Sequence, residues 1–162
     1  MCYHPGQMGL ASALALAATL AATSAHAADT SVDARLKARN VPFVVDSDGD
    51  YKITYSYEKE GRTQNVFVSG KPESIGDLTI REIYAAAGKV DEDGIDGAMA
   101  LKLLEDSQSK KLGSWELAGN ILIYVIKLPD NADAASLEAA IKIAAEVADD
   151  KEIELSGKKD AL

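Results

Sequence analysis

Two acidic segments carry the side chains with the clearest chemical potential in this sequence. The segment DSDGD at residues 46–50 has carboxylates at alternate positions, the spacing of the first ligands in a calcium-binding EF-hand loop. The pattern then fails, because position six requires glycine and is Tyr51, and position twelve requires glutamate and is Tyr57. Residues 91–97 have their glycines at positions four and seven and fail the same test. We interpret residues 46–50 as a hairpin turn and residues 91–97 as a solvated loop, and we predict no metal site.

The composition removes several catalytic chemistries from residues 28–162. The only cysteine, Cys2, and both histidines, His4 and His26, precede Ala28. Without them this part of the chain has no Ser–His or Cys–His pair, no disulfide and no zinc site of the usual kind. Neither the P-loop nor the dinucleotide-binding glycine pattern occurs, and no spacing selects a pair of carboxylates for acid–base catalysis. We expect a protein that is not an enzyme and that uses no cofactor.

Three aromatic side chains are the candidate partner-binding residues. Residues 51–57 alternate tyrosine or isoleucine with polar residues, which places Tyr55 and Tyr57 on one face of a strand. Such a row can form a platform for a peptide, or it can pack in the core beneath helices. Trp115, the sole tryptophan, is either an anchor in a binding groove or a residue packed under a helix. We favour core packing in both cases, and we name these three residues as the candidates for a groove.

The elements that position these side chains follow from hydrophobic period and turn residues. Thr30 or Ser31 and Asp133 are suitable helix N-caps, and Leu103 and Leu104 are expected to face inward. We expect helices over residues 30–40, 98–111 and 133–149. We expect strands over residues 43–45, 51–57, 63–69, 113–117 and 121–126. Residues 70–77 are expected to be a loop, and residues 78–88 suit either a helix or a further strand.

Neighbouring strands joined by tight turns favour hairpins over parallel crossovers. We therefore expect the α+β class, with an antiparallel sheet of about five strands and helices packed on it. The expected order is α-β-β-β-(β/α)-α-β-β-α. Residues 28–162 form a single domain in this interpretation, with a core over about residues 32–150 and a frayed tail at residues 157–162.

Residues 1–27 are expected to be a secretory signal peptide. Residues 8–27 contain no charged side chain and end in Ala-His-Ala, a small-x-small cleavage site. The usual cationic start is missing, and the sequence leaves open whether the chain begins at Met1 or Met8. The apolar run is shorter than the ~20 residues that a membrane-spanning helix needs, so a cleaved signal is favoured over a retained anchor. We expect a periplasmic protein, with release from the cell left open.

The formal charge of −9 lies wholly after residue 27. An acidic domain without a basic stripe repels phosphate backbones, so nucleic acid is not an expected partner.

Several segments resemble the YbjN family. The resemblance rests on GSWEL at residues 113–117, the hairpin to LIYVIKLP at residues 122–129, and the helix from Leu137 to Asp149. The order of segments from Leu36 to Val68 also follows the family, so the resemblance covers roughly residues 32–150. It implies a bacterial sensory transduction regulator with a fold similar to type III secretion chaperones, which bind unfolded segments of partner proteins, often as dimers. It also favours a strand for residues 78–85, whereas the export signal departs from a family regarded as cytoplasmic.

We therefore expect a non-catalytic exported protein of YbjN type, chaperone-like or regulatory, that binds a protein or peptide partner. A homodimer is compatible with this expectation, and no stable membrane span is expected after signal cleavage. The alternative is a periplasmic sensor of a small molecule or ion, with residues 46–50 and 91–97 as its candidate site.

Overall fold

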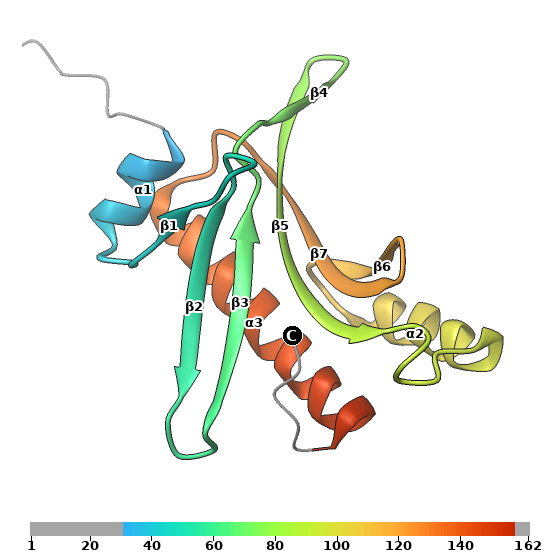
Figure 1. The fold of residues 1–162 in the computed structure, drawn as a ribbon. Helices are drawn as coiled ribbons and strands as arrows, with labels where there is room; N and C mark the ends of the chain where they lie inside the picture. The colour runs from blue at the N-terminus through green and yellow to red at the C-terminus, as the bar shows by residue number, and fades with distance from the viewer. Residues whose placement is uncertain (1–30, 158–162) are drawn as a thin grey trace, which may run out of the picture.

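The computed structural model describes residues 31–157, which form an α+β fold (Figure 1). The predicted signal peptide, residues 1–27, and residues 158–162 of the predicted frayed tail lie outside the described residues. The helices are α1 (Val32–Ala38), α2 (Gly97–Ser109) and α3 (Ala134–Ser156). The strands are β1 (Val44–Val45), β2 (Tyr51–Tyr57), β3 (Arg62–Val68), β4 (Glu73–Ile75), β5 (Leu78–Lys89), β6 (Ser114–Ala118) and β7 (Ile121–Pro129).

All seven strands belong to one antiparallel sheet. The strand order is β1-β2-β3-β5-β7-β6, and β4 pairs with β5 off this path. The expected α+β class is confirmed, although the sheet has seven strands rather than about five. The hairpin turn predicted for residues 46–50 joins β1 to β2, and Ser31 caps α1 by accepting a hydrogen bond from the Ala34 amide.

The segment with two alternative interpretations, residues 78–88, is a strand. It forms most of β5, the central strand, which pairs with β3 on one side and with β7 on the other. Ile83, Ala85 and Ala87 alternate along β5 and are fully buried on the side that α3 covers. The small alanines allow α3 to approach the sheet closely, because a helix packs nearer to a surface without large side chains.

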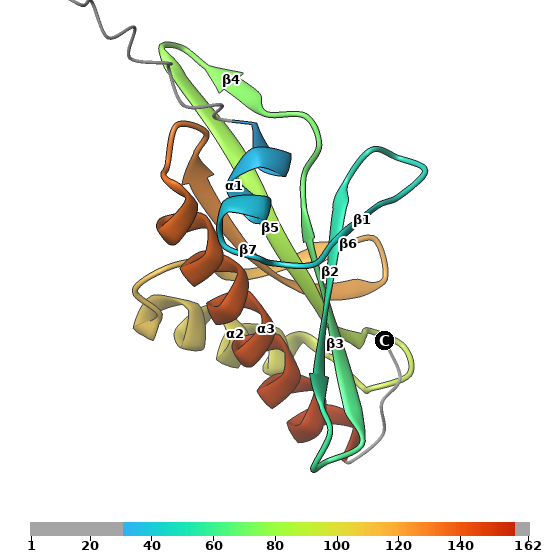
Figure 2. The same cartoon turned by 90° about the vertical axis from the view of Figure 1, so that its left-hand side faces the viewer.

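A short strand lies within the loop expected for residues 70–77. Ile75 pairs with Leu78 across the two-residue turn Gly76-Asp77, and this hairpin extends beyond the rest of the sheet (Figures 1 and 2). Every residue of β4 is exposed. The prediction was wrong because a strand with both faces in solvent carries no alternation of apolar and polar residues.

Helix α3 continues to Ser156, beyond the end expected at Asp149. Most residues at positions 150–154 are charged and do not continue the apolar stripe of the helix. However, Glu152 is only 1% exposed and accepts a hydrogen bond from Arg62 Nη2 at 3.0 Å. Asp149 is also buried and accepts from Arg62 Nε at 3.1 Å and Nη2 at 2.9 Å. A buried cation on β3 therefore allows the charged end of α3 to pack on the sheet.

The β2–β3 hairpin separates from β5 as it approaches its turn (Figure 1). β3 pairs with β5 only over residues 66–68 of β3. Beyond this point the Gln64 side chain donates from Nε2 to the Ala86 carbonyl at 3.0 Å, and Arg62 reaches α3. Buried polar side chains thus connect the two parts of the sheet where main-chain pairing stops.

All three helices lie on one face of the sheet, and the hydrophobic core lies between them and the strands (Figure 2). The opposite face carries Phe67 and Tyr84 as a stacked pair, with ring centroids 5.3 Å apart. Among residues 31–157, none of the helices has both the length and the apolar character required to cross a membrane.

Candidate functional site

The three candidate aromatic residues do not come together. Tyr55 and Tyr57 lie on β2, near one edge of the sheet, and Trp115 lies on β6, at the other edge. All three side chains point to the helix-covered face, as the alternation of burial along both strands shows. The structure therefore offers two separate regions rather than one groove.

Trp115 is packed beneath α2 and beside α3. It is 6% exposed, and its indole Nε1 donates to Asp106 Oδ2 on α2 at 2.7 Å. Its ring meets Tyr124 edge-to-face at a centroid distance of 5.0 Å, and Lys151 Nζ of α3 lies 5.9 Å from its centroid. Trp115 therefore fixes the position of α2 against the rest of the molecule.

These contacts change the pKa of the Asp106 carboxyl. Burial acts to raise its pKa, but the hydrogen bond from Trp115 and the charges of Lys110 and Lys151 outweigh burial. The pKa of Asp106 consequently lies below its usual range, and the carboxylate is the form that holds α2 to Trp115.

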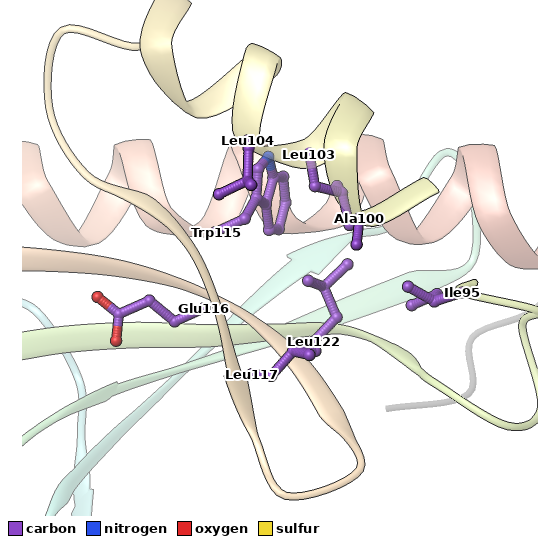
Figure 3. Close-up of a pocket in the computed structure, with 8 residues that line it drawn as sticks. All are labelled: Ile95, Ala100, Leu103, Leu104, Trp115, Glu116, Leu117 and Leu122. Atoms are coloured by element: carbon purple, nitrogen blue, oxygen red, sulfur yellow. The ribbon is translucent and has the colours of Figure 1, made fainter. Parts of the chain in front are cut away.

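An apolar pocket opens beside Trp115, between α2 and the β6–β7 hairpin (Figure 3). Its volume is about 270 Å³. Leu103 and Leu104 point into it from α2, and Leu117 and Leu122 lie across from them on the hairpin. The remaining lining residues are Ile95, Ala100, Trp115 and Glu116. The only charged lining residue, Glu116, directs its carboxylate away from the leucines and pairs with Lys127 at 2.9 Å.

Two of the leucines that line this pocket are exposed. Leu104 on α2 is 63% exposed, and Leu117 on β6 is 57% exposed. Leu103 is buried as expected, but the expectation that Leu104 faces inward was wrong. The reason is that α2 has apolar residues on two faces, and the sheet covers only the face of Leu103. Large apolar side chains gathered at one place on a surface mark interaction sites.

The edge of the sheet beside the pocket is partly open. The two-residue turn at residues 119–120 sets the alternation of bonded and non-bonded pairs between β6 and β7. By this alternation the main-chain groups of Trp115 and Leu117 point away from β7. The Trp115 amide donates to Ser107 Oγ on α2 at 3.0 Å, so α2 covers the edge there. The N–H and C=O of Leu117 face outward beside the pocket and are available to a further chain.

Tyr55 and Tyr57 are half-buried beside α3. Burial raises the pKa of Tyr55, and Glu138 and Glu146 raise it further. Burial, followed by the charges of Asp149 and Glu146, raises the pKa of Tyr57 to about 12. Both hydroxyls therefore stay protonated and face an acidic surface.

The carboxylates of the first acidic segment are engaged in structural hydrogen bonds. Asp46 Oδ1 accepts from the amides of Asp48 at 3.0 Å and Asp50 at 2.9 Å, which closes the turn. Asp50 accepts from the Gly70 amide at 2.8 Å and from the Tyr84 hydroxyl at 2.7 Å. Burial and this hydrogen bond raise the pKa of Tyr84. Residues 46–50 thus connect the β1–β2 turn to the segment that follows β3 and to β5.

The second acidic segment also has structural roles. Asp93 Oδ2 accepts from the Lys89 amide at 2.6 Å, and Asp96 caps α2 by accepting from the Met99 amide at 2.9 Å. Across residues 31–157, no three His, Cys, Asp or Glu side chains are grouped so that they could hold a metal ion.

Trp115, one of the candidates named from the sequence, lines this pocket, but the sequence did not indicate the other lining residues. Ile95, Ala100, Leu117 and Leu122 come from a loop, a helix and two strands, and only the packing of α2 brings them together. One available signal was the tight β6–β7 hairpin, which places Leu117 and Leu122 opposite each other.

No protein-family model matches this chain, and no curated protein has a significantly similar sequence.

Proposed function

We propose that this chain is a non-catalytic, exported protein of YbjN type, chaperone-like or regulatory, that binds a protein or peptide partner. The binding site is the pocket between α2 and the β6–β7 hairpin. The observation that supports it is the combination of an apolar pocket, exposed leucines at its mouth and outward-facing main-chain groups at Leu117.

These features suit a segment of polypeptide. Extended peptides bind at sheet edges through main-chain hydrogen bonds, while side-chain pockets beside the edge provide specificity. Leu117 offers the main-chain groups, and the leucines of α2 line the neighbouring pocket. A partner segment with one or two large apolar residues fits both.

A periplasmic sensor that binds a small apolar molecule is the alternative proposal. The pocket volume of about 270 Å³ supports it, because this lies near the lower end of small-molecule sites. The ion-binding version of the alternative has less support, since the carboxylates of Asp46, Asp50, Asp93 and Asp96 already accept internal hydrogen bonds.

Fluorescence of the single tryptophan tests the proposal directly, because Trp115 lines the pocket. The purified protein is titrated with an acetylated peptide that alternates leucine and serine, and with a matched peptide in which glutamine replaces leucine. We expect a saturable change in Trp115 emission with the leucine peptide only. Equal responses to both peptides, or none, would contradict binding of an apolar segment. A response to small apolar molecules but not to the leucine peptide would support the sensor.

Export is tested by fractionation of cells. We expect the chain to reach the periplasm and to remain in the cytoplasm when residues 8–27 are deleted. A cytoplasmic location of the intact chain would contradict this part of the proposal.

A further inference from the structure

A second open edge of the sheet lies on β2, far from the pocket. In the part of the chain that the structure describes, β1 pairs only with residues 51–52, and on the side of β2 away from β3 no strand lies beside residues 53–57 (Figure 1). The Asp46 amide donates to the Asp50 carbonyl at 2.9 Å, which shows that even-numbered residues direct their main-chain groups to this side. The alternation of an antiparallel ladder then places the N–H and C=O of Thr54 and Ser56 at the outer edge.

This edge lacks the usual protection against a further strand. Natural sheets guard their edges with charged residues, proline, bulges or a covering element. Residues 53–57 are Ile-Thr-Tyr-Ser-Tyr, which have high strand propensity and include no charge and no proline. Thr54 and Ser56 are exposed. By contrast, Ser107 of α2 covers part of the β6 edge.

The space beside this edge is hollowed. A cavity of about 280 Å³ lies between residues 53–56 of β2, residues 39–42 after α1, and α3. A chain that enters it can pair with Thr54 and Ser56 while its side chains contact Tyr55.

The far end of this edge is acidic. Glu58 and Glu60 lie in the β2–β3 turn on either side of Lys59, and Glu146 is exposed on α3. Within residues 31–157 no ion pair neutralises Glu146. Burial raises the pKa of Tyr57, and the charges of Asp149 and Glu146 raise it further, so the Glu146 carboxylate lies near the end of β2.

A second copy of this chain is a poor occupant. Two copies would bring together chains that each carry a formal charge of −9. Arg39 and Lys142 line the cavity at the other end of the edge and share one carboxylate, Glu138, at 2.6 and 2.8 Å, so basic side chains of a partner fit the end near Glu146 rather than the cavity. Charge complementarity instead requires a cationic partner.

We propose that the free edge of β2 binds a basic, extended segment of a second protein, which joins the sheet as an added strand. Its main chain pairs with Thr54 and Ser56, and its lysine or arginine side chains lie against Glu146 and the turn carboxylates of Glu58 and Glu60. This inference is independent of the pocket beside Trp115, because it rests on the opposite edge of the sheet.

The test uses the purified protein and an acetylated peptide that alternates valine and lysine. A peptide of equal charge in which proline replaces valine is the control, since it cannot pair with a strand. We expect the first peptide to slow amide hydrogen exchange at Thr54 and Ser56 about tenfold or more, and the second to leave it unchanged. Equal effects of the two peptides, or protection confined to other amides, would overturn the proposal.

Variants separate strand pairing from general charge attraction. Glu146→Lys should weaken binding about fivefold, whereas Asp77→Lys on the distant hairpin, which changes the net charge equally, should change it less than about twofold. Ser56→Pro should abolish the protection at Thr54 without unfolding the protein, because proline is tolerated at a sheet edge. An equal loss of peptide affinity in the Asp77→Lys variant would refute the inference. Protection of the Thr54 amide without peptide, through self-association, would also refute it.

Discussion

Replacing Leu104 by glutamine should weaken the binding of an apolar segment to the pocket beside Trp115. Leu104 lines this pocket from α2 and is 63% exposed, so a ligand can bury at most that fraction. Complete burial of a leucine side chain contributes about 1.5–3 kcal/mol, so covering the exposed fraction contributes about 1–2 kcal/mol. The loss of this contribution corresponds to a roughly five- to thirtyfold increase in Kd.

The same change should leave the fold intact. Leu104 faces solvent in the free protein, and glutamine is a good helix former, so the free energy of unfolding should change by less than about 0.5 kcal/mol. Leu78→Gln is the matched control, because Leu78 is 65% exposed and lies at the other end of β5 from α2. Titration of Trp115 fluorescence with the leucine–serine peptide measures Kd, and thermal melting measures stability.

The two variants must behave differently for the reasoning to hold. If Leu104→Gln binds the peptide as tightly as the unchanged protein, the pocket is not the site. If Leu78→Gln loses as much affinity as Leu104→Gln, the peptide binds to exposed leucines in general.

Three further predictions concern the contacts that hold the site and the helices in place. Arg62→Met leaves Asp149 and Glu152 buried without their cation and should lower the free energy of unfolding by about 3–5 kcal/mol. In a protein that already carries Asp149→Asn and Glu152→Gln, Arg62→Met should lower the free energy of unfolding much less. If urea unfolding shows that the effects of these changes simply add, the coupling between Arg62 and the two carboxylates is refuted. Trp115→Phe removes the donor to Asp106 and should cost about 0.5–1.5 kcal/mol in thermal unfolding, whereas an unchanged stability would show that this hydrogen bond does not fix α2. Because the pKa of Asp106 is lower in the folded state, its stabilising contribution is present above the unfolded pKa of about 4 and is lost as pH falls through the folded value. Urea unfolding at successive pH values should therefore show a smaller acid-induced loss for Asp106→Asn, and an identical loss would contradict this assignment.

The elements with one polar face could be predicted from the sequence. Residues 51–57 alternate because the odd-numbered side chains face the helices and the even-numbered ones face solvent, and this segment is β2 as expected. The cap at Asp133 and the turn at residues 46–50 were also predictable, because their side chains act on neighbouring main-chain groups.

Elements whose environment depends on residues distant in the sequence could not be predicted from the sequence. β5 is covered by α3 and flanked by two strands, and its spacing of apolar residues fits a helix as well as a strand. The end of α3 depends on Arg62, which is separated from Asp149 and Glu152 by 87 and 90 residues. Charged side chains suggest a surface unless the partner that neutralises them is known.

The pocket was beyond sequence reasoning for a related reason. The period of α2 shows which residues share a face, but it does not show which face the sheet covers. Leu103 and Leu104 are neighbours in the sequence, yet the first is buried and the second is exposed. The position of α2 is set by the contact between Trp115 and Asp106, which only the three-dimensional arrangement reveals.

We propose that the pocket between α2 and the β6–β7 hairpin binds a segment of another protein. The most direct measurement places a photo-crosslinking amino acid at Leu117 in the native host, with the same substitution at Leu78 as the control. We predict that the photo-crosslinking amino acid at position 117 forms a crosslink to a distinct partner. The Leu104→Gln substitution should weaken this crosslink, and the photo-crosslinking amino acid at position 78 should not form it. Crosslinks from Leu117 only to a second copy of this chain, or the same products from both positions, would contradict the claim.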